Sequence, residues 1–360
     1  SIPSQIDRLA LAQVKIEGLR FEGFEKGKPK LALKLSSFDL LGVKNSKIEK
    51  VTMAGEVEVS KNGFAEDRAR FQLKNVTLNK FDFSKIVTAI LYDSQQDLLV
   101  GLSDGFGLND LHITDFRFSD GQDEVYMSSG NILVSKEKWA DFEVTGFAVT
   151  NSSKTMTASI GSASLMTLDL NMLDPSVTTN KGRAKAISTY LGVTELKLKD
   201  AFVQSADTGQ KRTGVKGITL DNISRVDGFV TAANLNIEKF IVPIGMIAQE
   251  TQDIAAIARE VTGSDEVMVS VEVGSDYDVS RSAYGIILGV EVSAFGDLTL
   301  KVSLEDVPFE KLKALSNAND LLDTLETLGE LNETVSFKGA SIRYVDGAVS
   351  YTHLTLPTKA

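Results

Sequence analysis

The sequence of 360 residues contains no cysteine and only two histidines, His112 and His353. The lack of cysteine excludes a disulfide framework, a thiol nucleophile and a cysteine-ligated zinc site. Two histidines are too few for a multi-histidine metal centre, so we expect neither a metal site nor a cofactor. The sequence also has no run of 18 consecutive apolar residues. A membrane-spanning helix is therefore not expected within it.

Positive charge is also scarce. Lysine and arginine number 38 against 49 aspartates and glutamates, which gives a formal net charge of −11. No local stripe of basic residues is present, so nucleic acid is not an expected partner. Hydrophobic residues make up 42% and charged residues 24%, as in average globular proteins, and a wholly disordered chain is excluded.

The two ends of the sequence differ from the rest. Residue 1 is serine rather than methionine, so we expect a mature product or a fragment. Residues 350–360, SYTHLTLPTKA, depart abruptly from the preceding pattern and resemble translated adapter sequence at the end of an assembled reading frame. We expect this segment to be a non-native or disordered tail, and His353 not to belong to the native protein.

One pattern recurs along the chain: apolar-x-apolar, two polar residues, apolar-x-apolar. A shuffled chain of this composition would contain about one strict copy, and seven are present. The strict copies begin at Val14, Leu33, Phe71, Val76, Leu111, Val302 and Val335. Looser copies begin at Phe142, Leu196 and Leu235. These starting positions are too irregular for a leucine-rich repeat.

The polar pair inside each copy has a geometric consequence. Residues three positions apart in a regular strand point to opposite faces of the sheet. One extra residue at the pair, as in a β-bulge, would keep all four apolar side chains on one face. Pairs such as Glu17–Gly18, Thr114–Asp115 and Lys199–Asp200 contain the residue types that tolerate unusual backbone dihedrals. The alternative is that each pair forms a two-residue hairpin turn between very short strands.

The pattern predicts a mainly β fold. We expect residues 1–349 to form one continuous, elongated antiparallel meander, with bulged strands curved into a U-shaped groove or an open sandwich. About four short amphipathic helices interrupt it, near 84–100, 178–191, 243–262 and 308–330. One helix covers roughly two strands, so four helices would leave much of the apolar face uncovered.

Two segments support a family resemblance. They are Leu73–Leu78 with the following Lys80–Ile86, and Val302–Leu312, and both are similar to AsmA/TamB-like envelope proteins. The same general residue pattern extends over residues 10–349. The resemblance implies a curved β-groove in a periplasmic or other cell-envelope protein. It implies a role in phospholipid transport or outer-membrane homeostasis, and attachment to the inner membrane through an anchor missing from this sequence. It implies no catalytic residues.

Phenylalanine dominates the aromatic residues, with 18 copies against one tryptophan. Six phenylalanines lie on the expected inward side of the motif: Phe81, Phe83, Phe116, Phe118, Phe142 and Phe147. They would form either a packed core or the lining of an acyl-chain groove. The sequence therefore predicts a non-enzymatic envelope protein that binds or conducts acyl chains of phospholipid or another lipid.

Two rival functions remain open. One is a structural or adhesive β-scaffold with a closed core and no lipid ligand. The other is a hydrolase, because Gly101–Gly105 matches the G-x-S-x-G motif around Ser103. A glycine-containing segment follows this motif where a helix would be needed, which favours a loop. His112 is expected on the polar face of its strand.

Several acidic groups also resemble metal ligands. Asp276 and Asp278 have calcium-loop spacing but lack the glycine and glutamate of that loop. We likewise expect the acidic tip of a hairpin at Asp120, Asp123 and Glu124. Both groups are therefore expected to be solvated turns.

Overall fold

The fold is mainly β, with long strands and few helices. The computed structural model describes residues 10–25, 28–44, 47–60, 68–82, 109–120, 123–134, 139–151, 153, 155–169, 193–205, 212–226, 229–247, 256, 259–260, 263–293, 295–317, 334–345 and 354–356. Contacts divide the chain into two units, Ser1–Gln210 and Lys211–Ala360, and each is described by itself.

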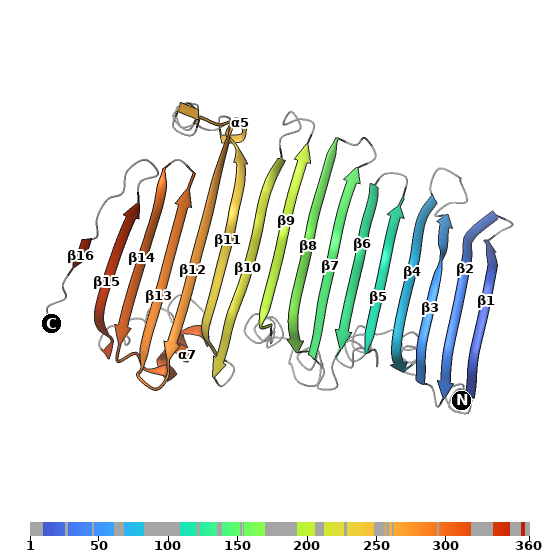
Figure 1. Cartoon of the computed structure of the whole chain (residues 1–360), viewed down its shortest axis with the longest axis horizontal. Helices are drawn as coiled ribbons and strands as arrows, with labels where there is room; N and C mark the ends of the chain where they lie inside the picture. Colours follow the sequence, from blue (N-terminus) through green and yellow to red (C-terminus); the bar gives the residue numbers. More distant parts are fainter. Residues whose placement is uncertain are drawn as a thin grey trace. The chain divides into compact units, whose positions relative to one another are not determined.

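The first unit contains nine strands. They are β1 (Ala10–Glu25), β2 (Lys28–Lys44), β3 (Lys47–Ser60), β4 (Arg68–Asp82), β5 (Asp110–Ser119), β6 (Asp123–Val134), β7 (Trp139–Asn151), β8 (Met156–Asp169) and β9 (Glu195–Ser205). Each strand pairs antiparallel with the next strand in the chain. Figure 1 shows these strands side by side in chain order. Within the described residues β1 pairs with β2 alone, so the sheet is open at this edge.

The second unit is also an antiparallel meander. Its strands are β10 (Arg212–Val226), β11 (Phe229–Pro243), β12 (Glu266–Asp278), β13 (Ala283–Val292), β14 (Gly296–Glu305), β15 (Ser336–Val345) and β16 (Leu354–Leu356). β16 lies in the segment 350–360 that was expected to be a tail, and its three residues pair with β15.

The expectation of a mainly β antiparallel meander is confirmed, but the strands are longer than the sequence indicated. Apart from β16 they contain 10 to 17 residues. With the exception of Glu305–Asp306, which follows the end of β14, the polar pairs lie inside strands. The alternative that each pair is a hairpin turn is therefore wrong, because the chain continues in the same strand beyond it.

The backbone at the polar pairs has the geometry that a bulge requires. In seven of the ten copies the second residue of the pair has a positive φ, between 49° and 68°. These residues are Gly18, Lys80, Asp115, Gly146, Asp200, Lys239 and Asp306. The other three copies contain a register shift at the pair instead. The sequence pattern thus predicts local backbone geometry correctly.

In the first unit the extra residues lie at one level of the sheet. Eight of its nine strands carry one residue there that has no partner in the strand register. We call this line the crease, and it consists of Gly18, Ser36, Lys74, Asp115, Ser128, Gly146, Gly161 and Asp200. Because neighbouring strands carry their extra residues at the same level, the cross-strand pairing continues in the same register on both sides of the crease.

β3 is the exception, and it shows which residues share a face. Its register passes from Met53 through Ala54 to Gly55 without an extra residue. Met53 and Gly55 are therefore on the same face, as any residues two apart in a regular strand are. Cross-strand partners also share a face, so this face continues on both sides of the crease in every strand.

The helices agree only in part with expectation. Segments 84–100 and 178–191 lie outside the described residues. Within 243–262 the structure describes the single turn α5 (Ile244–Ile247), and within 308–330 it describes α7 (Phe309–Asn317). α7 is thus the one helix longer than a single turn in the described part of the chain. It begins after Pro308, which cannot continue the preceding strand pairing.

Candidate functional site

One face of the first unit is apolar from β1 to β9. Two cross-strand rows lie on the C-terminal side of the crease in β1. The row next to the crease is Leu19, Leu35, Gly55, Leu73, Phe116, Met127, Phe147, Ile160 and Ala201. The outer row is Phe21, Leu33, Val57, Phe71, Phe118, Val125, Val149, Ala158 and Val203.

Two further rows lie on the other side of the crease. The inner row is Ile16, Phe38, Met53, Val76, Ile113, Gly130, Val144, Ala163 and Leu198. The outer row is Val14, Leu40, Val51, Leu78, Leu111, Ile132, Phe142, Leu165 and Leu196. These four rows of nine positions contain only apolar residues and two glycines. We call them the apolar face.

Most residues of the apolar face are partly buried, and Leu19, Phe21 and Val203 are exposed. Only Val51, Val76 and Gly130 of its members are fully buried. Phe21 at the β1 edge is 55% exposed. All extensive contacts between described elements join elements that follow one another in the sequence. The described residues therefore form no second layer on this face. Monomeric soluble proteins rarely expose so large an apolar surface unless it binds something.

The dimensions of the apolar face suit a hydrocarbon chain. Four rows extend about 20 Å along the strands, and nine strands extend about 38 Å across them. The hydrocarbon depth of one membrane leaflet is about 15 Å, half of the bilayer core. An acyl chain could therefore lie on this face in either direction without reaching a polar residue.

The structure brings four of the six predicted phenylalanines together on the apolar face. Phe116 and Phe147 share the row beside the crease, and Phe118 stands against Phe71 with a ring-centroid distance of 4.7 Å. Phe142 lies in the outer row on the other side. The backbone of Phe81 pairs with Ile48, and Phe83 lies outside the described residues.

The second unit carries a similar apolar face. One of its rows is Leu220, Leu235, Val273, Leu288, Leu300 and Ile342, of which Val273, Leu288 and Ile342 are exposed. One end of this face is covered. There Tyr277 and Val307 are buried, and Phe309 and Leu312 of α7 pack against them.

A hydrogen bond strengthens this cover. The Tyr277 hydroxyl donates to the carbonyl of Val307 at 2.8 Å, and the Phe309 ring stacks on Tyr277 with a centroid distance of 5.7 Å. In the described part of the chain α7 therefore covers one end of the face, and Val273, Leu288 and Ile342 of the row are exposed.

The opposite face of the first unit is polar, and His112 lies on it as expected. Its row reads Lys15, Asp39, Thr52, Thr77, His112, Asn131, Glu143, Ser164 and Lys197. His112 Nδ1 is hydrogen-bonded to the Asn131 side chain, which donates to Glu143 at 3.4 Å. Ser103 lies outside the described residues.

Asp120 and Asp278 lie at hairpin turns as expected, whereas Asp276 lies within β12 and pairs with Gly285. Asp278 accepts hydrogen bonds from the Ser280 amide at 2.9 Å and the Ser280 hydroxyl at 2.6 Å, and these bonds lower the pKa of its carboxyl group. Asp120 accepts one from the amide of Asp123 at 2.8 Å. The part of the chain that the structure describes contains no group of three or more acidic or histidine side chains placed to hold a metal ion. Nor is any described helix both long and apolar enough to cross a bilayer.

Comparison of the chain with protein-family models, with curated proteins and with solved structures finds no match. A function must therefore be inferred from the arrangement of the chain's own residues.

The phenylalanines predicted from the sequence are only part of the apolar face. Met127 and Ile160 continue the same row between and beyond Phe116 and Phe147. The signal was available in the alternation of β6 and β8. Without the register, however, no pattern could show that these strands stand beside those with the motif.

Proposed function

We propose that this protein binds acyl lipids on the apolar face of its sheet. The observation that carries the proposal is the continuous apolar surface across nine strands, most of whose residues keep part of their surface exposed. Water contact with this surface is unfavourable by about 25 cal/mol for each Å². Acyl chains placed on it would remove that contact for both partners, while lipid headgroups would remain in water.

The proposal specifies a non-enzymatic role in the cell envelope, in the periplasm, with phospholipid transport or outer-membrane homeostasis as the process. The resemblance of its motif to AsmA/TamB-like proteins supports this location and process. The crease supports the further idea that the sheet is curved into a groove, because bulges bend and twist strands. Recognition would be loose, because an apolar surface selects by length and width.

A closed scaffold without lipid is the competing explanation. It requires a second layer over the apolar face, and the described residues supply one only at the α7 end of the second unit. Native mass spectrometry of gently purified protein separates the two ideas. The proposal predicts phospholipid adducts that disappear on delipidation and return when phospholipid is added. A protein free of lipid in both measurements would contradict it.

A further inference from the structure

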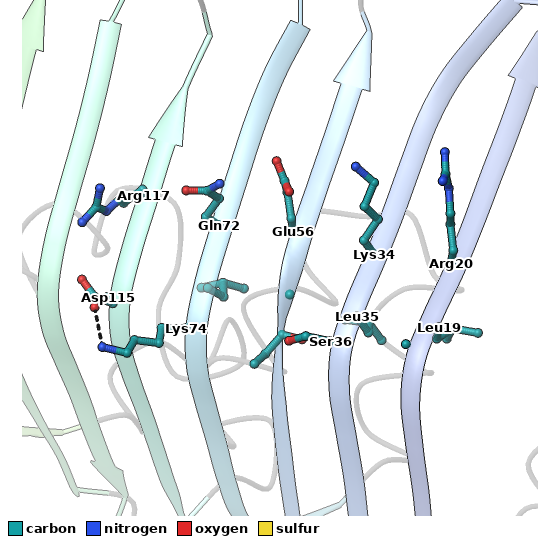
Figure 2. Close-up of a pocket in the computed structure, with 14 residues that line it drawn as sticks. Leu19, Arg20, Lys34, Leu35, Ser36, Glu56, Gln72, Lys74, Asp115 and Arg117 are labelled. Carbon is teal, nitrogen blue, oxygen red and sulfur yellow. Dashed lines mark hydrogen bonds and ion pairs between the residues drawn. The ribbon is translucent and has the colours of Figure 1, made fainter.

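A groove in the first unit is lined by charged and polar side chains of the polar face together with Leu19, Leu35 and Leu73 of the apolar row beside the crease. The groove has a volume of about 630 Å³ and crosses β1 to β5 at the crease. It lies where β3 lacks the extra residue that its neighbours carry at Ser36 and Lys74. In Figure 2, side chains from successive strands stand in a row along it.

The floor of the groove is backbone. A Cβ atom added at Gly55 would lie 2.4 Å from the Lys34 carbonyl oxygen and 2.9 Å from the Leu35 Cα. The backbones of β2 and β3 therefore approach each other too closely for any side chain at position 55. Glycine at this position therefore permits the close approach of β2 and β3 beneath the groove.

The groove is cationic although the chain as a whole has a net charge of −11. Its lining contains four basic side chains, Arg20, Lys34, Lys74 and Arg117, and two acidic ones, Glu56 and Asp115. Both acids are already paired. Glu56 contacts Arg70 at 2.9 Å, and Asp115 contacts Lys74 at 3.1 Å.

Two of the cations have no carboxylate partner within the described residues. Lys34 makes no ion pair there; in the register it lies between Arg20, whose guanidinium contacts Glu22, and Glu56. Arg117 lies over the Tyr126 ring, 5.3 Å from its centroid. A bound anion would neutralise Lys34 and Arg117, with which no described carboxylate forms an ion pair.

The arrangement of these charges indicates the shape of the ligand. One basic pair, Arg20 and Lys34, lies on β1 and β2, and the other, Lys74 and Arg117, lies on β4 and β5. Three strand spacings separate the two pairs, or about 14 Å. The hydrogen-bonding side chains Ser36 and Gln72 lie between them.

We propose that this groove binds an acidic sugar with anionic groups near its two ends. Arginine suits the ends because its planar donors match the oxygens of carboxylates and phosphates. The Gln72 amide and the backbone floor suit hydroxyl groups between them. The groove is open along the sheet, which admits an extended molecule rather than a compact ion. This proposal does not depend on lipid binding, because it rests on the charged side chains of the polar face.

Calorimetric titration of the full chain with trigalacturonic acid, with maltotriose as the neutral probe of similar size, tests the proposal. We expect binding of the acidic sugar alone, weakening as salt increases. Lys34→Gln should weaken it roughly tenfold, because a charge-assisted hydrogen bond is lost, and Lys34→Gln with Arg117→Gln further. Lys199→Gln, an exposed lysine on β9 of the same unit, is the matched control and should change nothing.

Glu56→Gln should act in the opposite direction. It removes a negative charge from the groove while Arg70 keeps its ion pair with Glu58, so the acidic sugar should bind more tightly. A role of these residues in folding alone would not produce opposite effects on binding. Melting temperatures of all variants verify that they fold.

A sugar carried on a lipid headgroup is distinguished by a second arm with phosphatidylcholine vesicles, with and without a phosphoinositide. Binding only to phosphoinositide vesicles, lost in the double variant, would assign the site to lipid-borne sugars. Absence of binding in both arms, or binding that the double variant leaves unchanged, would overturn the proposal.

Discussion

Replacing Phe116 with aspartate places a carboxylate in the middle of the apolar face. Phe116 stands between Leu73 and Met127 in the row beside the crease, and its side chain is half-buried by its neighbours. The exposed half of the ring is available to an acyl chain. Because the described sheet has no second layer here, we expect the substitution to leave folding largely intact and to affect lipid binding.

The magnitude follows from two contributions. Covering half of a phenylalanine ring contributes about 1 kcal/mol of the 1.5–3 kcal/mol typical for a fully buried large side chain. A carboxyl group without a partner against hydrocarbon costs at least about 1–3 kcal/mol, the range for unpaired polar groups in proteins. Together these give about 2–4 kcal/mol, so an acyl chain crossing this position should bind between about thirtyfold and several hundredfold more weakly.

Displacement of a fluorescent fatty-acid probe from delipidated protein measures this change. Because the face is about 38 Å long, lipid could bind elsewhere along it, and the number of bound probes should fall together with the affinity. Phe116→Asp with Phe147→Asp, two strands apart in one row, should remove more sites than either alone. Ser159→Asp, on the polar face of β8, is the matched control. Equal loss in the control, or unchanged binding in the double variant, would refute the reasoning.

Three further predictions concern the crease and the α7 cluster. Gly55→Ala should lower the melting temperature by several degrees, whereas Gly339→Ala, where an added Cβ meets nothing within 4 Å, should not; equal shifts would contradict the close approach at position 55. The Lys74 ammonium lowers the pKa of the Asp115 carboxyl below its ordinary 3.8, so the stability it contributes is present above about pH 4 and lost as pH falls through the lowered pKa. Thermal melts should therefore show wild type exceeding Asp115→Asn at pH 6 and converging with it in acid, and a difference constant with pH would count against the pairing. Tyr277→Phe leaves a buried carbonyl without its donor and should cost about 1–3 kcal/mol by urea unfolding; a cost near zero would mean that water reaches α7.

Much of the local structure could be predicted from the sequence, because the deciding information is local. Alternation of apolar residues identifies strands. The polar pair identifies where a strand needs one extra residue to keep the following apolar side chains on the same face. Gly18, Asp115 and Asp200 adopt positive φ at the predicted positions. The full length of the strands could not be predicted from the motif. β3, for example, continues regularly through Ala54 and Gly55 and carries no copy of it.

The site required information that is not local. Whether Phe116 stands beside Met127 or beside another residue depends on the register between β5 and β6. The cationic groove depends on a one-residue difference between β3 and its neighbours, visible only when the strands are aligned. Lys34 and Arg117 are 83 positions apart in the sequence, and no spacing rule connects them.

The most direct test is to find where an acyl chain touches the protein. Delipidated protein is loaded with a phospholipid that carries a photoactivatable diazirine in its acyl chain, irradiated, and mapped by peptide mass spectrometry. Labels are expected on apolar-face residues such as Leu73, Met127 and Ile160, and not on Tyr126 or Ser159 of the polar face. Labelling confined to the polar face, or spread equally over both faces, would contradict the account.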